Sequence, residues 1–277
     1  RSKGPRLDAA EEVEAADWFD QSKQPVVISA EDGIQLHGWL FDPDCAGAKP
    51  HLYAICCHGY SGQPQDMAKY AHRFARLGFT VLVPALRGHG LSEGRYAGMG
   101  WLDRRDLMRW ISLIIGSDAD ARILLQGKSM GAAAVMMTVG EPDLPRNVVA
   151  AVEDCGYASV GQQFIDCARS MFHLPKFLAK PIVTTMGAIA RRRAGYGFQE
   201  ASCVEQLKHA TIPMLFIHGG ADDFVPSRAL DENFDACASI DRQKLLIPSA
   251  GHSMSASTAP VVYWKTVTNF VTRVFGL

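Results

Sequence analysis

The segment from Ile123 to Ala134 constrains the fold of this chain most, because it places Gly127-Lys128-Ser129-Met130-Gly131 between two regular elements. The apolar run before this motif predicts a buried strand, and the small residues after it predict a helix. A serine at such a strand–turn–helix corner adopts a strained backbone that holds its hydroxyl above a sheet. Glycine is required on both sides, since a Cβ would collide where strand and helix nearly touch. The motif therefore predicts Ser129 as a nucleophile, with an ordinary tight turn as the alternative.

Apolar runs and amphipathic segments alternate along the rest of the chain. Further strands are predicted over residues 26–29, 36–41, 52–57, 80–84, 148–154, 214–218 and 244–247, with helical patterns between most of them. The first two runs flank an Asp-Gly turn at 32–33, which predicts a hairpin. Strands that alternate with helices predict a parallel sheet covered on both faces. We therefore expect an α/β fold with a mostly parallel, eight-stranded sheet.

Two segments stand outside this alternation. Residues 1–24 are charged and show no clear periodicity, so they are predicted as a tail that docks through Trp18 and Phe19. Residues 156–210 contain no predicted strand and many apolar side chains, which predicts a helical lid inserted into the domain formed by residues 25–277. The apolar side chains of this insertion could line an acyl pocket or seal the lid against the sheet: Phe164, Met171, Phe172, Phe177, Leu178 and Met186.

Composition excludes several classes of protein. The 277 residues are 48% apolar with a net charge of −1, which gives no electrostatic case for nucleic acid or for general attraction to an anionic membrane. The longest weakly polar run, 181–190, is shorter than the ~20 residues that span a bilayer. Seven scattered cysteines without a CxxC pair indicate neither a disulfide framework nor a metal site. The chain starts at Arg1 without methionine, which leaves a cytoplasmic and an exported or cell-surface location both open.

A serine nucleophile needs a base, and the base needs an acid to orient it. Among nine histidines, His252 alone follows the last strand, at the sheet edge where such folds place their sites. Asp222 and Asp223 follow the preceding strand and are the first candidates for the acid. Glu153 and Asp154, at the end of an earlier strand, remain a second choice. The chain order serine, aspartate, histidine is the one found in α/β-hydrolases.

Several further motifs accompany these residues: His58-Gly59-Tyr60, Arg87-Gly88-His89-Gly90-Leu91-Ser92, Glu153-Asp154-Cys155-Gly156-Tyr157 and His218-Gly219-Gly220-Ala221-Asp222. Together with the serine motif and Gly251-His252, they resemble the α/β-hydrolase superfamily. Within it they are similar to the bacterial serine aminopeptidase-like and BEM46-like branch, often described as exported or cell-surface esterases. The resemblance covers nearly everything from Val26 to Leu277.

The resemblance implies a role for each matching position. Ser129 would be the nucleophile, His252 the base and Asp222, rather than Asp223, the acid. The backbone N–H groups of Tyr60 and Met130 would form the oxyanion hole. The side chains expected to contact the substrate are Tyr60, Phe172, Phe177 and Phe224.

The expected activity is hydrolysis of small to medium carboxylic esters through an acyl-enzyme, without a metal or cofactor. A serine peptidase acting on a peptide-like substrate is one alternative, in which Glu200 or Glu205 would hold the free amine. A non-catalytic binding module of the same fold is the other. Arg191-Arg192-Arg193 is predicted as a solvated face, with contact to an anionic substrate or a membrane surface as a second interpretation.

Overall fold

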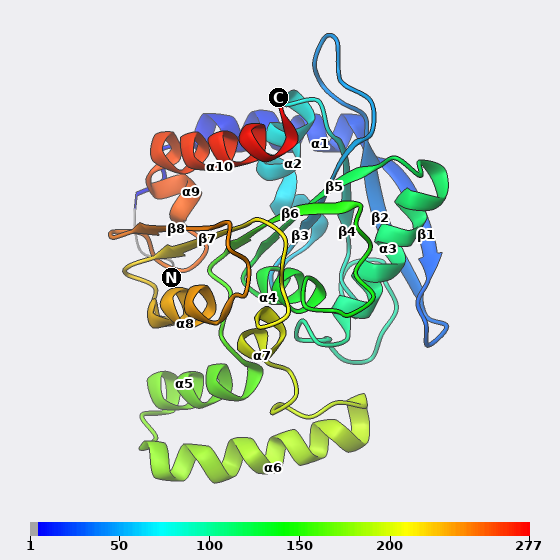
Figure 1. Cartoon of the computed structure of the whole chain (residues 1–277). Helices are drawn as coiled ribbons and strands as arrows, with labels where there is room; N and C mark the ends of the chain where they lie inside the picture. Colours follow the sequence, from blue (N-terminus) through cyan, green and yellow to red (C-terminus); the bar gives the residue numbers. More distant parts are fainter. Residues whose placement is uncertain (1–4) are drawn as a thin grey trace.

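The computed structural model describes residues 5–277 and confirms an eight-stranded, mostly parallel sheet covered by helices on both faces (Figure 1). The strand order is β1-β2-β4-β3-β5-β6-β7-β8. The strands are β1 Gln24–Ser29, β2 Gln35–Phe41, β3 Leu52–Cys57, β4 Thr80–Pro84, β5 Arg122–Lys128, β6 Val148–Asp154, β7 Met214–Gly219 and β8 Arg242–Ile247.

The hairpin predicted at one edge of the sheet is present. Strands β1 and β2 pair antiparallel, and β2 pairs antiparallel with β4. Gly33, in the turn between β1 and β2, has a φ of 87°, a conformation that glycine adopts without strain. All pairings from β4 to β8 are parallel, so the carboxyl ends of these strands meet at one edge.

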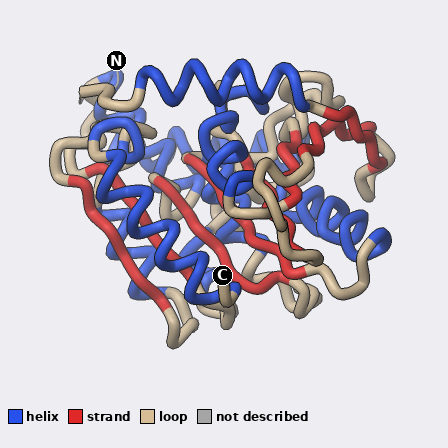
Figure 2. Tube along the Cα trace, turned by 90° about the horizontal axis from the view of Figure 1, so that it is seen from above, coloured by secondary structure: helices blue, strands red, loops and turns tan. Residues whose placement is uncertain are grey.

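Each face of the sheet carries its own hydrophobic core. Helices α1 Ala9–Ser22, α2 Ala68–Arg76 and α10 Pro260–Phe275 cover one face. Helices α3 Asp103–Ser117, α4 Met130–Thr138 and α8 Arg228–Ala236 cover the other. Figure 2 shows helices on both sides of the strands. Strands buried on both faces read as continuous apolar runs, which explains why β3 and β5 could be predicted from sequence.

The amino-terminal tail expected over residues 1–24 is instead largely helical. Residues 1–4 lie outside the described part of the chain, and α1 occupies most of the remainder. The spacing of Ala15 and Phe19 gives this helix a buried stripe despite its many charges. The predicted docking is confirmed, because Phe19 is fully buried and the Trp18 ring stacks on Phe41 with centroids 4.7 Å apart.

The segment between β6 and β7 contains α5 Val160–Phe172, α6 Lys176–Ala194 and α7 Cys203–Leu207. Helix α7 packs on α4 and α8, whereas α5 and α6 pack on each other and lie away from the sheet (Figure 1). We call α5 and α6 with their connecting loop the cap. The remaining elements on and around the sheet are called the body. Short helices η1 Pro64–Met67 and α9 Ser255–Thr258 complete the body.

Candidate active site

Ser129 stands at the sharp turn between β5 and α4. Its backbone has φ 57° and ψ −118°, the strained conformation expected at this corner. A Cβ at Gly131 would overlap the carbonyl of Cys57, and one at Gly127 would overlap the carbonyl of Gly131. The Ser129 N–H donates to the Asp154 carbonyl oxygen at 2.8 Å. The two glycines thus let the chain turn tightly enough to present the Ser129 hydroxyl at the sheet edge.

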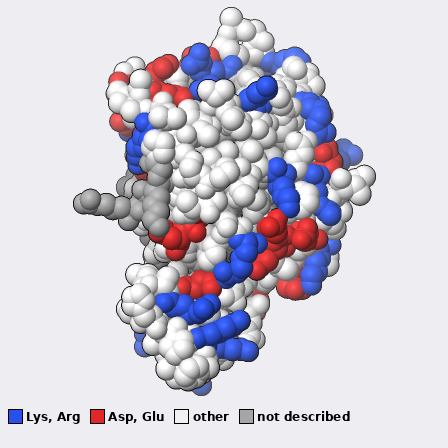
Figure 3. All heavy atoms as spheres, turned by 90° about the vertical axis from the view of Figure 1, so that its left-hand side faces the viewer, with Lys and Arg blue, Asp and Glu red and all other residues white. Residues whose placement is uncertain are grey.

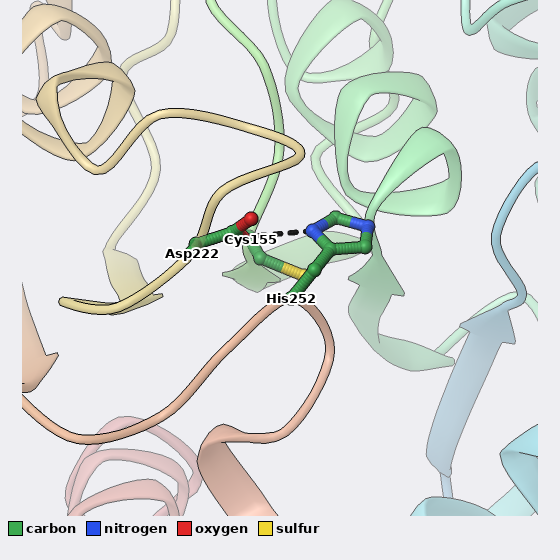
Figure 4. A group of neighbouring side chains, drawn as sticks. All are labelled: Cys155, Asp222 and His252. Carbon is green, nitrogen blue, oxygen red and sulfur yellow. Dashed lines mark hydrogen bonds and ion pairs between the residues drawn. The ribbon is translucent and has the colours of Figure 1, made fainter. Parts of the chain in front are cut away.

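His252 lies on the loop after β8 and faces the serine. Its Nε2 lies 2.8 Å from Ser129 Oγ, and its Nδ1 lies 2.7 Å from Asp222 Oδ2. The Asp222–His252 contact is visible in Figure 4. Ser129 and Asp222 are 93 residues apart in the chain, and Asp222 and His252 are 30 residues apart. Three distant segments therefore converge at this site. We call these three residues the Ser–His–Asp series.

Asp222 accepts three hydrogen bonds and is almost fully buried. Its Oδ1 accepts the N–H groups of Phe224 and Val225, both at 2.9 Å. Burial alone would raise the pKa of Asp222, but the hydrogen bonds from His218 and His252 lower it to about 2. The carboxylate is therefore ionised at neutral pH and fixed for its contact with His252.

His218 supports this carboxylate from the interior. Its Nε2 donates to the Val225 carbonyl at 3.0 Å and lies 3.4 Å from Asp222 Oδ2. Burial favours the neutral ring, but the interactions with Asp222, Cys155, Glu153 and the Val225 carbonyl together outweigh burial and raise the pKa of His218. The sequence predicts only a loop-holding role for His218, because the HGxxD spacing does not reveal that both residues point to one place.

The second-choice acids do not reach His252. The Tyr263 hydroxyl donates to Asp154 at 2.9 Å, and the Gly156 N–H donates to Glu153 at 3.0 Å. Burial raises the pKa of both carboxyl groups. Of the four candidate acids, Asp222 is the one that is hydrogen-bonded to the imidazole.

The loop after β3 carries Tyr60, whose N–H is one of the two expected oxyanion donors. Within residues 5–277, neither this N–H nor that of Met130 donates a hydrogen bond. Two histidines hold the loop by its carbonyls: His58 Nδ1 donates to Gly59 O at 2.8 Å, and His89 Nε2 bonds Tyr60 O. The Gly59 and Tyr60 carbonyls thus accept hydrogen bonds from the two histidines, and the N–H groups of Tyr60 and Met130 can donate to a substrate oxygen.

His58 is wholly buried and accepts the Leu86 N–H on its Nε2 at 3.1 Å. A ring that donates at Nδ1 and accepts at Nε2 is the neutral tautomer. Burial lowers the pKa of His58 to about 4. His58 therefore has a structural role, as its position before a glycine predicts.

A cavity of about 520 Å³ opens above Ser129. Tyr60 and Phe224 line it, in agreement with the sequence, and the Phe224 ring lies 5.0 Å from the His252 ring. Phe172 and Phe177, the other two side chains expected to contact the substrate, do not line it and are 70% and 75% exposed. They lie at the end of α5 and the start of α6, where apolar character alone does not say which way a side chain faces.

Among the other residues of this cavity, Met171 is expected as a possible lining of an acyl pocket and Asp223 as a candidate acid, whereas Ser170, Lys128 and Asp66 were not selected from sequence. Met171 and Ser170 approach from α5, while Lys128, Asp66 and Asp223 add charge. Met171 belongs to the apolar residues of the insertion, but helical periodicity does not identify its contact with the cavity. Lys128 directly precedes Ser129, and its place in the serine motif is the signal that could have identified it.

Cys155, Asp222 and His252 form a cluster whose ligand atoms lie within 4.8 Å of one another (Figure 4). A metal ion there would have to replace the 2.7 Å hydrogen bond between Asp222 and His252. Burial also raises the pKa of the Cys155 thiol, which opposes the thiolate that metals prefer. The three groups therefore fit a hydrogen-bonded site better than a metal site.

The fold and the serine motif define this chain as an α/β-hydrolase. The family model described as "Serine aminopeptidase, S33" matches residues 48–186, half of the chain, and the chain belongs to this family. The uncharacterized protein YqkD of Bacillus subtilis is 26% identical over 255 residues, which cover 91% of this chain and 81% of YqkD. The uncharacterized protein Rv2307c of Mycobacterium tuberculosis is 29% identical over 231 residues, covering 82% and 72%.

Solved structures show the same fold. The Pyrococcus furiosus esterase Pf2001 superposes with a TM-score of 0.72 at 20% identity, covering 91% of this chain and 92% of the esterase. The Pyrococcus horikoshii acylaminoacyl peptidase has a TM-score of 0.63 at 14% identity, covering 91% of this chain and 42% of the peptidase. Among the helices of residues 5–277, none has both the length and the apolar character needed to cross a bilayer.

Proposed function

We propose that this chain is a serine hydrolase that cleaves carboxylic esters through an acyl-enzyme. The single observation that carries the proposal is the Ser–His–Asp series, with distances of 2.8 Å and 2.7 Å. A serine hydroxyl is a weak nucleophile unless a base within hydrogen-bond reach takes its proton. His252 is within that reach, and Asp222 orients it.

In the first half-reaction, Ser129 Oγ attacks the ester carbonyl while its proton moves to His252 Nε2. Asp222 accepts the Nδ1–H and stabilises the imidazolium that forms. The carbonyl oxygen becomes negative, and the N–H groups of Met130 and Tyr60 receive it. Each such donor contributes about 3 kcal/mol to transition-state stabilisation.

The tetrahedral intermediate then collapses. The bond to the alcohol oxygen breaks, and His252 gives the alcohol its proton, which leaves Ser129 acylated. Water repeats the sequence in the second half-reaction: His252 takes its proton, the hydroxide oxygen adds to the acyl carbon, and Ser129 leaves with the proton. The products are an alcohol and a carboxylic acid. The cavity of about 520 Å³ suits a small to medium acyl group.

The test is labelling with a fluorophosphonate together with hydrolysis of nitrophenyl acetate and butyrate. Ser129→Ala should abolish both, whereas Ser61→Ala removes another serine hydroxyl of the same cavity and should keep both. A Ser129→Ala protein that still turns over ester would overturn the proposal. Wild-type protein that neither reacts with the probe nor cleaves ester would instead favour the binding module.

A serine peptidase is the second candidate, and one observation supports it. Asp66 and Asp223 line the cavity, where a carboxylate could hold the free amine of a substrate. The carboxylates that the sequence suggests are placed elsewhere: Glu200 pairs with Arg191, and Glu205 pairs with Lys208. Comparing aminoacyl anilides with acyl nitrophenyl esters separates the two candidates, and faster cleavage of the anilides would favour the peptidase.

A further inference from the structure

The cap exposes a row of large apolar side chains. Its members are 40% to 75% exposed and lie at the end of α5 and along α6: Met171, Phe172, Phe177, Leu178, Ile182, Met186 and Ile189. We call these seven residues the cap ridge. Single exposed apolar residues are ordinary on a protein surface, but a contiguous group marks an interaction site.

The cap ridge is separate from the side of α6 that packs on the protein. Ala179, Val183 and Gly187 are buried and follow each other at i, i+4 and i+8. Leu178, Ile182, Met186 and Ile189 repeat with the same helical period but start one residue earlier, so they form a second, adjacent apolar stripe. The first stripe is covered by the chain, and the second has no cover within residues 5–277.

The cap is also the basic part of an otherwise acidic chain. The cap, residues 160–194, contains six Lys or Arg and one acidic residue, Asp166, so the remaining 22 basic and 28 acidic residues give the rest of the chain a charge of −6. Arg191 pairs with Glu200 at 3.4 Å. The other five form no ion pair within the described residues: Arg169, Lys176, Lys180, Arg192 and Arg193. Figure 3 shows Lys and Arg side chains on the lower part of the molecule, where the cap lies.

We propose that the cap ridge docks onto the surface of an anionic lipid bilayer. Apolar side chains that flank cations on one helix are the combination that inserts into the headgroup region while the cations attract anionic lipids. The charge argument selects this occupant over a second copy of the chain, because two basic caps brought face to face would repel each other. Docking through exposed side chains requires no helix to span the membrane.

Docking in this orientation turns the mouth of the Ser129 cavity toward the lipid. Met171 belongs to the cap ridge and also lines that cavity, and Phe224 on the opposite rim is 44% exposed. An amphipathic ester in the bilayer would therefore reach the serine without crossing the aqueous phase. This consequence rests on the proposed hydrolase activity, whereas the docking itself does not.

The experiment is co-sedimentation of the full chain with phosphatidylcholine vesicles, with and without 30% phosphatidylglycerol, at low and high salt. We expect binding to the anionic vesicles that is at least tenfold tighter than to the neutral ones and that weakens with salt. Phe172→Ser with Phe177→Ser should lower the affinity at least tenfold. Arg192→Gln with Arg193→Gln should remove most of the preference for anionic vesicles.

Matched controls lie on α10. Val261 and Val262 are 79% and 50% exposed, so Val261→Ser with Val262→Ser removes two exposed apolar side chains elsewhere. Lys265→Gln removes an exposed cation, and Ser129→Ala removes the proposed nucleophile. All three control proteins should bind like the wild type. Circular dichroism of each variant verifies that the fold is retained.

Several results would overturn the docking proposal. One is absence of binding to anionic vesicles by the folded wild-type protein. Another is equal loss of binding in the α10 controls. A third is a stable dimer in size-exclusion chromatography that Phe172→Ser with Phe177→Ser converts to a monomer, because the cap ridge would then be covered by a second copy. Loss of ester hydrolysis in Ser129→Ala with vesicle binding intact separates this proposal from that of the hydrolase.

Discussion

The body and the cap hold their side chains in opposite ways. In the body, Asp222 accepts three hydrogen bonds and lies 3.4 Å from His218 Nε2, and Ser129 is fixed by a strained turn between two glycines. In the cap, seven large apolar side chains are exposed and five cations have no partner within the described residues. The body is organised around one fixed geometry, whereas the cap presents an adaptable surface.

This difference suggests a division of labour. An acyl-transfer reaction depends on distances near 2.8 Å, so its groups must be held by buried hydrogen bonds and close packing. Recognition of a lipid surface depends on apolar area and charge, which tolerate small movements. Substitutions in the body should therefore have large effects on chemistry and stability, and those in the cap small ones.

The largest effect is expected from Asp222→Asn. The amide keeps the shape of the carboxylate but cannot stabilise the imidazolium or select the correct tautomer, so kcat should fall about 10⁴-fold. Asp223→Asn is the matched control, since it changes a neighbouring carboxylate that lines the cavity, and should change kcat less than tenfold. The measurement is hydrolysis of nitrophenyl butyrate. If the two variants lost activity equally, the assignment of the acid to Asp222 would be wrong.

A second contrast compares two glycines. A Cβ at Gly131 would overlap the Cys57 carbonyl, which is fixed in the sheet, so Gly131→Ala should destabilise the protein by about 3 kcal/mol. A Cβ at Gly187 in the cap would lie 3.4 Å from Phe198 Cβ. There the better helix propensity of alanine, roughly 0.5–1 kcal/mol, offsets the tight contact.

Urea unfolding of both variants measures this difference. We expect a clear fall of the midpoint for Gly131→Ala, and a change within about 1 kcal/mol for Gly187→Ala. An equally large loss for Gly187→Ala would show that the cap is packed as tightly as the body.

The sequence was most informative where one physical constraint dominates. The strands β3 and β5 are buried on both faces, so their apolar runs stand out, and the turn at Ser129 admits almost no residue but glycine on its two sides. Strand order indicates His252 and a set of candidate acids, because the carboxyl ends of parallel strands meet at one edge, whereas the choice of Asp222 among those acids comes from the family resemblance.

The structure departs from the sequence-based expectations in segments with weaker constraints. The charges of α1 mask its short buried stripe, so a tail is expected where a helix forms. Phe172 and Phe177 are apolar, yet they are exposed and do not line the cavity, since hydrophobicity does not distinguish a pocket from a surface that binds something else. Met171, one residue earlier on the same helix, is the residue that lines the cavity.

The pH dependence of the free energy of unfolding should reflect a buried histidine of the body, His58. Burial lowers the pKa of His58 from 6.5 to about 4, so the unfolded chain binds a proton in this range that the folded chain does not. The contribution of His58 is complete above pH 6.5 and is lost as the pH falls toward 4, by about 2 kcal/mol between pH 7 and pH 5.

Unfolding free energies of wild type and His58→Gln at pH 7 and pH 5 isolate this contribution. The wild type should lose about 2 kcal/mol more than the variant over this interval. His209→Gln changes an exposed imidazole and serves as the control. Equal slopes for wild type and His58→Gln would contradict the buried neutral ring.

The smallest expected effect distinguishes an aromatic residue that lines the cavity from one that is exposed on the cap ridge. Phe224 lines the cavity beside His252, so Phe224→Ala should raise KM for a short soluble ester about fivefold, or about 1 kcal/mol. Phe177 is 75% exposed on the cap ridge, and Phe177→Ala should change this KM less than twofold. A fivefold increase for Phe177→Ala as well would mean that the cap closes over the substrate, and the division between a catalytic body and a docking cap would no longer hold.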